Sequence, residues 1–533
     1  MNPFKGLTFG QSLDLLRREY GGREALVFKG RRWTFTEACA EIDRAAARLG
    51  TLGLREGDKV GLWLPNRPEF LWYWLAAGRI GLVAVLLNTR LKHDEAAYQL
   101  RQSETRAAVV PGAGSFRDFV GELSAMRAEL PLLQRVLALD PLEHPVAGVE
   151  DWSGPLPSGL KQPPDAIDPE AAVLIAYSSG TTALPKGAML THCLFRKTWD
   201  HGPRFDQTPE DRLYLCVPLF GILSTVNGVL TFWSRGSCVV LAERFEAREA
   251  LTTLQDERCT AMYLLPLMLE QMLTDPEFKR FDLSALRTGI IVATDPNILR
   301  RAANELGIKG FFTSYGMTET SSAVTRTRHD DPLDIRATTH GKMLPDIEVR
   351  IADPETNAPL PDGDYGEIQV KGYCVMKGYF NKPEETRKAF SDDGWFKTGD
   401  GGLRLPDGAF QFQRRLKDGY KFNGFNVSTV EVESVMAQHP AVQSAAVVGM
   451  PDRAHGEIGV AFVILRDGNA AAPQEIQDFL KPRLASFKQP QHVFIVADLP
   501  LTAGTGKVQK FKLREMAEQA LAARAESAGA SHG

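Results

Sequence analysis

The 533-residue sequence predicts an α/β protein with a large N-terminal domain and a small C-terminal domain. A chain of this length exceeds the size at which a single hydrophobic core stops growing, so at least two domains are expected. Up to about residue 415, short apolar runs alternate with helical patterns, as in parallel sheets covered by helices. After Arg415 the pattern becomes that of a small α+β unit. We therefore expect domains at residues 1–415 and 416–533.

The strands of the large domain are the clearest elements. Each is a short, uninterrupted apolar run, which is typical of a strand buried on both faces; the runs cover residues 60–64, 107–110, 172–176, 238–241 and 289–292. Residues 71–87 are the most apolar segment, but Gly78, Arg79 and Gly81 interrupt it. This favours a buried helix followed by a core strand over a membrane span. Between about 345 and 415, turns such as Pro361-Asp362-Gly363 predict an antiparallel, barrel-like region.

The C-terminal part shows a helix around residues 430–438, strands at 441–448 and 458–465, a helix at 474–484 and a strand at 492–496. The last residues, 526–533, are small and polar, so we expect them to be disordered.

Composition excludes several function classes. The formal net charge is −4, which gives no electrostatic reason to expect nucleic acid or an anionic membrane as a partner. The six cysteines form no CxxC pair, and the histidines show no HExxH spacing, so no zinc site or disulfide framework is indicated. The first residues do not resemble a secretory signal, so we expect the protein in the cytoplasm.

The first chemically informative segment follows the strand at 172–176. Hydroxyls, a glycine and a lysine come in close succession, and their N–H, O–H and ammonium groups can surround phosphate oxygens; these residues are Ser178, Ser179, Gly180, Thr181, Thr182 and Lys186. The alternative is a Ser/Thr-rich surface loop. Lys186 stands between Pro185 and Gly187, and residues 501–508 also lack the GxxxxGK[ST] spacing. A P-loop ATPase is therefore disfavoured.

This loop resembles the phosphate-binding signature of the adenylate-forming superfamily, which contains acyl-CoA synthetases, firefly luciferase and the adenylation domains of nonribosomal peptide synthetases. Further motifs recur in the family's order, and the match spans nearly the whole chain. They are Tyr315-Gly316-Met317-Thr318-Glu319, Gly366-Glu367-Ile368 with Gly378-Tyr379, Trp395 to Asp400, Arg415-Leu416-Lys417-Asp418 and Leu499 to Lys507. Any one motif could arise by chance, but the ordered set is specific.

The resemblance implies a nucleotide site. Glu319 would hold Mg²⁺, which bridges ATP phosphate oxygens. Thr318 would bind the α-phosphate, and Lys507 would neutralise charge during catalysis. Tyr315 would stack on adenine, and Gly316 would lie beside it in the ATP site. Asp400 would bind the ribose, and Arg415 would bind the ribose or the phosphates. Taken alone, Glu319 would be a surface carboxylate and Asp400 an Asx-turn residue.

The resemblance also implies a moving C-terminal domain. Lys417 falls on the family's hinge position. Gly424 falls in the segment that forms the wall of the pantetheine tunnel for CoA, although a plain turn glycine is the alternative. Three segments depart from the family pattern: Ala183 replaces a glycine of the phosphate loop, Gly221 replaces a histidine found in many relatives, and Ala293-Thr294-Asp295 replaces the usual adenine-side residues.

The acid should bind beside an apolar segment. The expected pocket residues are Phe220, Gly221, Ile222 and Trp233, near Leu223 and the strand at 312–316. Residues 216–230 contain no carboxylate to bind an α-ammonium group, which disfavours an amino acid. A fatty, alicyclic or aromatic monocarboxylate is favoured.

The expected reaction is that of an ATP-dependent carboxylate–CoA ligase. ATP and CoA would be co-substrates, and Mg²⁺ would be the cofactor. The carboxylate displaces pyrophosphate from ATP, and CoA then takes the acyl group from the acyl-adenylate. Three alternatives stay open: an acyl-AMP ligase that loads a carrier protein, a luciferase-like oxygenase, and a catalytically silent nucleotide-binding homologue. The presence of Lys507, Glu319 and Asp400 speaks against the silent homologue. A homodimer is also left open.

Overall fold

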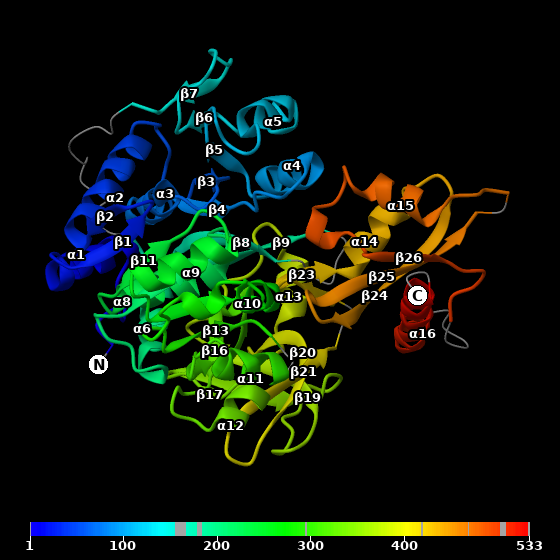
Figure 1. The fold of residues 1–533 in the computed structure, drawn as a ribbon. Coiled ribbons are helices and arrows are strands. Elements are labelled where there is room, and N and C mark those ends of the chain that lie inside the picture. Colours follow the sequence, from blue (N-terminus) through cyan, green and yellow to red (C-terminus); the bar gives the residue numbers. More distant parts are fainter. Residues whose placement is uncertain are drawn as a thin grey trace. The chain divides into compact units, whose positions relative to one another are not determined.

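Figure 1 shows the computed structural model, which describes residues 2–154, 167–178, 184–293, 296–416, 419–466, 468–500 and 508–530. The chain divides into two compact units. Unit 1 consists of Met1–Thr89, Ala96–Tyr177 and Lys186–Arg414, and unit 2 of Arg90–Glu95, Ser178–Pro185 and Arg415–Gly533. Two short N-terminal segments thus group with the C-terminal part of the chain, which the sequence pattern does not indicate.

Two seven-stranded sheets form the centre of unit 1 (Figure 1). The first has the order β14-β13-β12-β10-β11-β1-β2 and contains β1 (Glu24–Phe28), β2 (Arg31–Thr34), β10 (Arg212–Leu215), β11 (Cys238–Leu241), β12 (Ala261–Leu264), β13 (Thr288–Ile291) and β14 (Gly310–Phe312). The second has the order β7-β6-β5-β3-β4-β8-β9 and contains β3 (Lys59–Leu62), β4 (Val83–Leu86), β5 (Thr105–Val110), β6 (Arg135–Ala138), β7 (Val149–Asp151), β8 (Ala172–Ser178) and β9 (Lys186–Thr191). Core strand pairs such as β3–β4 and β12–β13 are parallel, while β2 pairs antiparallel with β1. All five apolar runs form strands, as predicted.

Helices cover these sheets because their apolar faces need a partner. α2 begins with a capping box in which the Thr34 hydroxyl accepts from Glu37 N–H. α3 is buried along nearly its whole length and is followed by β4, which confirms the helix and strand predicted within residues 71–87. The helices of this part of the chain are α1 (Phe9–Tyr20), α2 (Phe35–Gly50), α3 (Pro68–Arg79), α4 (His93–Gln102), α5 (Phe119–Ala125), α6 (Leu194–Trp199), α7 (Ile222–Ser224), α8 (Thr231–Ser234), α9 (Ala247–Asp256), α10 (Pro266–Leu273), α11 (Pro296–Asn304), α12 (Leu333–Thr338) and α13 (Pro383–Ala389).

The remaining strands of unit 1 form two smaller sheets. One is antiparallel and contains β15 (Ser314–Met317), β16 (Ser322–Arg326) and β17 (Lys342–Met343). The other is a curled sheet in the order β18-β19-β20-β21, with β18 (Ile347–Ala352), β19 (Gly366–Gly372), β20 (Phe396–Arg404) and β21 (Phe410–Arg415). In this sheet, β18 pairs antiparallel with β19, and β19 pairs antiparallel with β20. The predicted barrel-like region is confirmed as this half-barrel.

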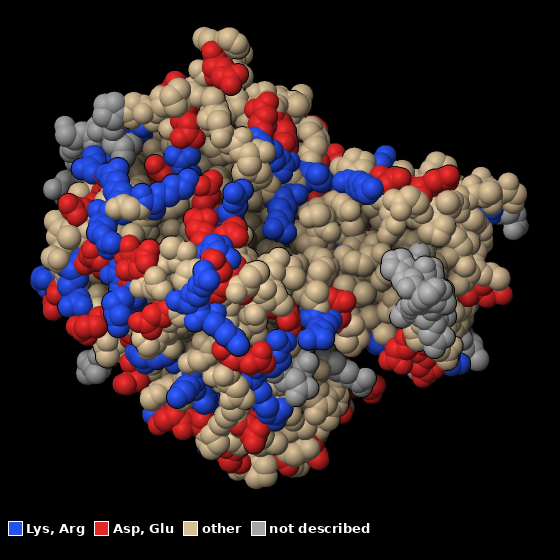
Figure 2. Space-filling view, viewed as in Figure 1, with Lys and Arg blue, Asp and Glu red and all other residues tan. Residues whose placement is uncertain are grey.

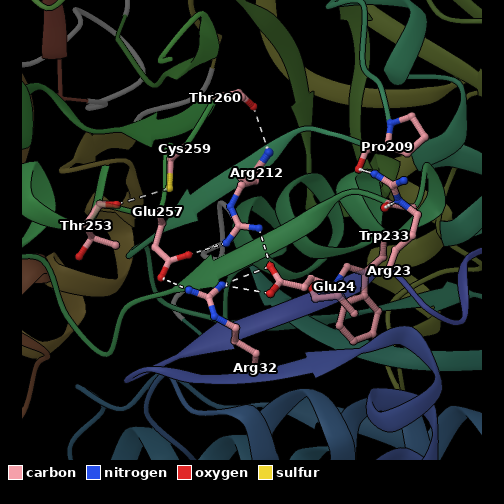
Figure 3. A network of polar contacts seen from close by, with 12 residues as sticks. Arg23, Glu24, Arg32, Pro209, Arg212, Trp233, Thr253, Glu257, Cys259 and Thr260 are labelled. Atoms are coloured by element: carbon pink, nitrogen blue, oxygen red, sulfur yellow. Dashed lines mark hydrogen bonds and ion pairs between the residues drawn. The ribbon is translucent and has the colours of Figure 1, made fainter. Parts of the chain in front are cut away.

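An ion network fixes the edge of the first sheet (Figure 3). Arg212 donates to Glu24 at 2.6 Å and to Glu257 at 2.5 Å. Arg32 donates to the same two carboxylates at 3.2 and 2.6 Å, so that β2 is tied to β10 and to the end of α9. Elsewhere on the face drawn in Figure 2, basic and acidic side chains are interspersed.

Unit 2 contains a mixed sheet in the order β23-β22-β25-β24, with β26 parallel to β25. The predicted α+β pattern is confirmed by β22 (Gly419–Phe422), β23 (Phe425–Ser428), α14 (Thr429–Met436), β24 (Val442–Asp452), β25 (Gly456–Leu465), α15 (Pro473–Leu480), β26 (His492–Ile495) and α16 (Lys510–Ala530). α15 ends four residues before the predicted end at 484. The prediction of disorder is wrong for residues 526–530, because the alanine-rich end of the chain continues α16; residues 531–533 lie outside the described part.

No helix of the described chain combines the length and the apolar character that a membrane crossing needs.

A buried ion triad lies inside unit 2. The Lys488 ammonium donates to Glu431 Oε1 and to Glu95 Oε1, each at 2.8 Å. Burial raises the pKa of Glu431. Burial alone would lower the pKa of Lys488, but the two carboxylates outweigh it and raise that pKa. The triad therefore joins the Arg90–Glu95 segment to α14 through one neutralised cation.

We predict that Lys488→Met destabilises unit 2 by about 3–5 kcal/mol, because it leaves two carboxylates buried without their cation. The matched control is Lys481→Met, since Lys481 is exposed and pairs with Asp478 at 2.6 Å; a surface pair of this kind contributes about 1 kcal/mol or less. Hydrogen exchange of the β25 and α14 amides in the full chain measures both effects. Equal protection in the two variants would contradict a structural role for the triad.

Candidate functional site

The motif Tyr315–Glu319 lies where β15 turns into β16. β15 carries Tyr315 and Gly316, and a single turn, η5 (Thr318–Thr320), carries Thr318 and Glu319. The register shifts between Tyr315 and Gly316, so the strand bulges there. A Cβ on Gly316 would lie 2.2 Å from the carbonyl oxygen of Ser322, which only glycine avoids.

The turn itself is strained. Ser321 has a φ of 52° and Ser322 a φ of 88°, which lie in the region that residues other than glycine rarely adopt. Such strain persists where the surroundings fix it, and it clusters at functional sites. Met376 N–H donates to the Glu319 carbonyl at 2.7 Å and holds the turn from outside.

The structure brings Tyr315 and Asp400 together. The Tyr315 hydroxyl donates to Asp400 Oδ2 at 2.9 Å, and both residues are buried. Asp400 lies on β20 directly after Gly399, whose φ is 70°. The Gly399 N–H donates to Glu367 Oε1 at 2.9 Å, which anchors the bend on β19. Two motifs that are far apart in the sequence therefore meet through one hydrogen bond.

A small cavity of about 120 Å³ lies beside this pair. The Tyr315 ring stacks on Phe412 with 5.9 Å between the ring centroids, and Phe412 also lines the cavity. Its other lining residues are Ala293, Pro296, Leu299, Thr313, Ala337, Thr338, Thr339, His340 and Gln411. Ala293 belongs to the segment expected beside adenine; Thr294 and Asp295 lie outside the described residues.

Tyr379 joins Lys186 to Glu319. Its hydroxyl donates to Glu319 Oε1 at 3.0 Å, and the Lys186 ammonium lies 4.7 Å from the centre of its ring. The same ammonium donates to Glu385 Oε2 at 3.0 Å, and this contact lowers the pKa of Glu385. Lys186 and Glu319, both predicted as site residues, thus lie on either side of one tyrosine.

Two members of this arrangement were not assigned a role from the sequence. Tyr379 belongs to the Gly378-Tyr379 motif, so the sequence contained a signal for it. Glu385 lies in the first turn of α13 with Glu384 beside it. Acidic residues are common in the first turn of any helix, so the pattern could not distinguish Glu385 from an ordinary surface residue.

Glu319 is the candidate metal ligand. It is buried, with 7% of its surface exposed. Among the described residues, no group of three or more His, Cys, Asp or Glu side chains could hold a metal ion. Magnesium is usually bound by one or two carboxylates together with substrate phosphates and water, rather than by a protein cage. The residues therefore fit magnesium that arrives with a nucleotide.

The predicted acyl-pocket residues fall into two groups. Phe220, Gly221 and Ile222 lie half-buried at the start of α7. A Cβ on Gly221 would meet only the Pro218 carbonyl oxygen, at 3.6 Å, so the space next to Gly221 is open. Trp233 instead lies fully buried on α8, where its indole donates to the Ala25 carbonyl at 2.9 Å. Its assignment to the pocket stays a prediction.

The helix that follows Gly221 is irregular. Between α7 and α8 the chain forms a π-helical segment, η3 (Thr225–Leu230). Such turns are rare and are frequent at functional sites.

The other predicted residues belong to unit 2. Ser178 ends β8 and is buried. Gly424 has φ 79° and follows Asn423 with φ 48°, which is a two-residue hairpin turn between β22 and β23. The hairpin turn by itself explains why residue 424 is a glycine. The contact of Gly424 with CoA therefore stays a prediction. Arg415 ends β21, but its side chain is not described. Ser179, Gly180, Thr181, Thr182, Ala183, Lys417 and Lys507 lie outside the described residues.

Comparison with known proteins identifies relatives along most of the chain. Residues 16–380 match the model of the AMP-binding enzyme family, and residues 431–507 match the AMP-binding enzyme C-terminal domain. An acyl-CoA ligase of Aspergillus fumigatus is 32% identical over 97% of this chain and 92% of its own. A mitochondrial medium-chain acyl-CoA ligase of Danio rerio is 30% identical over 98% of this chain and 90% of its own. The amide bond synthetase McbA from Marinactinospora thermotolerans has a similar structure, with a TM-score of 0.84, 26% identity and coverage of 96% and 99%.

We predict that Gly316→Ala destabilises unit 1 by about 1–3 kcal/mol, because the added methyl group meets backbone atoms that cannot move aside. Gly221→Ala is the matched control, since its methyl group enters open space; a change within about 0.5 kcal/mol is expected. Thermal denaturation of both variants measures the difference. If Gly316→Ala were as stable as Gly221→Ala, the bulge at Gly316 would not require glycine.

Proposed function

The chain belongs to the AMP-binding enzyme family, in the acyl-CoA synthetase branch of the adenylate-forming superfamily, and from this premise we propose that it is an ATP-dependent carboxylate–CoA ligase. The observation that carries the proposal is the convergence of Tyr315, Asp400, Glu319 and Lys186 on one turn of unit 1. These four residues come from three separate motifs, because Tyr315 and Glu319 share one, and their chemistry is that of a nucleotide site.

In the first half-reaction, an oxygen of the substrate carboxylate attacks the α-phosphorus of ATP, the bond to pyrophosphate breaks, and acyl-AMP forms. Tyr315 and the adjacent cavity hold the base, and Asp400 accepts hydrogen bonds from the ribose hydroxyls. Lys186 and Thr318 bind phosphate oxygens. Glu319 holds magnesium, which supplies positive charge to the phosphates when bound. The phosphate loop adds Ser178, Ser179, Gly180, Thr181 and Thr182, and Gly316 and Arg415 complete the set.

In the second half-reaction, the thiol of CoA attacks the carbonyl carbon of acyl-AMP, and AMP leaves with the thiol proton lost to solvent. We place the domains at residues 1–415 and 416–533, with Lys417 as the hinge between the two reaction steps. Gly424 borders the path of the pantetheine arm. These assignments follow the family motifs.

We propose that an apolar part of the substrate acid packs against Phe220, Gly221 and Ile222. The half-buried apolar side chains and the open space at Gly221 support this. A carrier-protein thiol is the alternative acceptor. An amine is a further alternative, because the structurally similar McbA is an amide bond synthetase.

A reducing compartment, the cytoplasm, is the proposed location. All six cysteines are free and five are buried, as expected where thiols stay reduced. Light scattering after size-exclusion chromatography distinguishes a monomer from the homodimer that the sequence leaves open.

The proposed function predicts that AMP and pyrophosphate form only when MgATP and a carboxylic acid are both present, and that acyl-CoA forms when CoA is added. A panel of acids, each assayed with CoA, with an amine and with a phosphopantetheinylated carrier protein, measures this. Pyrophosphate release that is equally fast without any acid would reject the ligase. Product with the amine or the carrier only would reject CoA as acceptor.

Lys507 is predicted to act in the first half-reaction alone. Removal of one transition-state charge contact costs about 10²–10³-fold in rate, so Lys507→Ala should slow acyl-AMP formation by that factor. Thioester formation from supplied acyl-AMP should stay near the wild-type rate. Lys417→Pro, which stiffens the hinge, should impair the thiol step more than adenylation. Equal damage to both half-reactions in Lys507→Ala would indicate a folding defect and contradict this division.

A further inference from the structure

The interior of unit 1 contains basic side chains that no acidic side chain of the described residues neutralises. Lys197 on α6 and Arg326 on β16 each have 0% of their surface exposed. In the part of the chain that the structure describes, the Nε and Nη1 atoms of Arg326 have no hydrogen-bond partner. The Lys197 ammonium has no oxygen partner there, and its polar neighbour is the Cys374 thiol. A buried charge without a partner is costly, so a native protein retains one only where something else offsets the cost.

His201 and Asn227 complete the group, which we call the buried basic cluster: Lys197, His201, Asn227 and Arg326. Arg326 Nη2 donates to Asn227 Oδ1 at 2.6 Å. His201 is fully buried; its Nδ1 lies 3.4 Å from the Thr231 hydroxyl, and the Ala323 backbone and the Asn227 side chain are its other polar neighbours. Several donors therefore meet in one apolar interior, where the acceptors are an amide oxygen and backbone groups but no carboxylate of the described residues.

The charges of the cluster act on one another. Burial, Arg326 and Lys197 together hold the pKa of His201 well below its usual value. Burial also lowers the pKa of Lys197, although the nearby Cys374 thiol opposes this in part. Burial lowers the pKa of Arg326 to about 10, so the guanidinium stays charged at neutral pH. At least one uncompensated positive charge is therefore present.

The cluster lies on the same chain segments as residues of the predicted acyl pocket. Asn227 lies in η3, six residues after Gly221, which corresponds to about 9 Å along a helix. The Arg326 guanidinium lies 4.5 Å from the ring centre of Phe312, in the segment expected to line the pocket. Arg326 also pairs with Ser314, next to Tyr315, in the β15–β16 ladder. The cluster is thus connected through one helix and one strand to the residues where the acid reacts.

We propose that the buried basic cluster binds a second carboxylate at the far end of the acid, so that the enzyme activates one end of a dicarboxylic acid. This inference rests on the proposed ligase function, and it replaces the monocarboxylate that the apolar sequence favours. The Arg326 fork and the Lys197 ammonium are the donors that bind a carboxylate most strongly. The middle of the acid passes Phe220 and Ile222.

The test compares acids of equal length in pyrophosphate release by the full-length enzyme. The pairs run from hexanoate and adipate to decanoate and sebacate, with suberate compared also with its monomethyl ester, in which one carboxylate remains and the other end is uncharged. We expect kcat/KM for the best dicarboxylate to exceed that of its monocarboxylate by about 30-fold or more, the usual effect of losing one partner of a buried charge pair. Equal use of octanoate and suberate, or of suberate and its monomethyl ester, would overturn the inference and leave the ligase intact. If no acid caused pyrophosphate release, both the ligase function and the dicarboxylate inference would be rejected.

Lys197→Met tests the cluster directly. It should reduce the preference for the dicarboxylate by about tenfold or more and raise the Tm of the ligand-free protein, because a buried unpaired cation is gone. Lys59→Met is the matched control: Lys59 is half-buried, burial lowers its pKa, and its ammonium lies 3.8 Å from Glu104. The control should leave the preference unchanged. A lower Tm with an unchanged preference in Lys197→Met would show that Lys197 is structural and would overturn the proposal.

Discussion

The candidate site depends on the pairing of residues 377–380 with β9. Lys377 N–H donates to the Met189 carbonyl at 3.0 Å, Met189 N–H to Gly378 at 3.0 Å, and Phe380 N–H to Gly187 at 2.8 Å. This pairing joins the edge of a parallel sheet to a chain segment nearly two hundred residues away. It places the Tyr379 ring against Lys186 and its hydroxyl on Glu319. The functional side chains are thus positioned by backbone hydrogen bonds, which a substitution of one side chain does not remove.

The sequence predicts the layers of unit 1 and most elements of unit 2, because both follow from local pattern. An apolar run such as residues 238–241 has few alternatives to a strand buried on both faces. The end of the chain shows the limit of this reasoning. Small polar residues at 526–530 suggest disorder, yet alanine is the strongest helix former and the preceding helix is already nucleated.

The sequence predicts the chemistry of the site better than its connections. Tyr315 and Asp400 are recognisable within their motifs, but their hydrogen bond depends on a bulge at Gly316 and a bend at Gly399, which only tertiary structure reveals. At Gly424 the structure offers a simpler explanation than the motif does, because an ordinary hairpin turn also favours glycine at this position. Lys197 carries no signal at all, because beside Arg196 in Leu194–Trp199 it has the pattern of an exposed helix face.

Comparison with the other buried lysines of this chain supports the proposal that the buried basic cluster binds a ligand. Lys488 is almost fully buried, and two carboxylates lie 2.8 Å from its ammonium. Lys186 is also buried, and it has Glu385 at 3.0 Å together with the face of Tyr379. In both places the fold supplies the compensating charge from its own residues. At Lys197 and Arg326 it supplies an amide oxygen and aromatic rings, but no carboxylate of the described chain. Since the fold neutralises the two other buried lysines of the described chain, an anion that arrives with the substrate accounts for this exception in a way that packing alone does not.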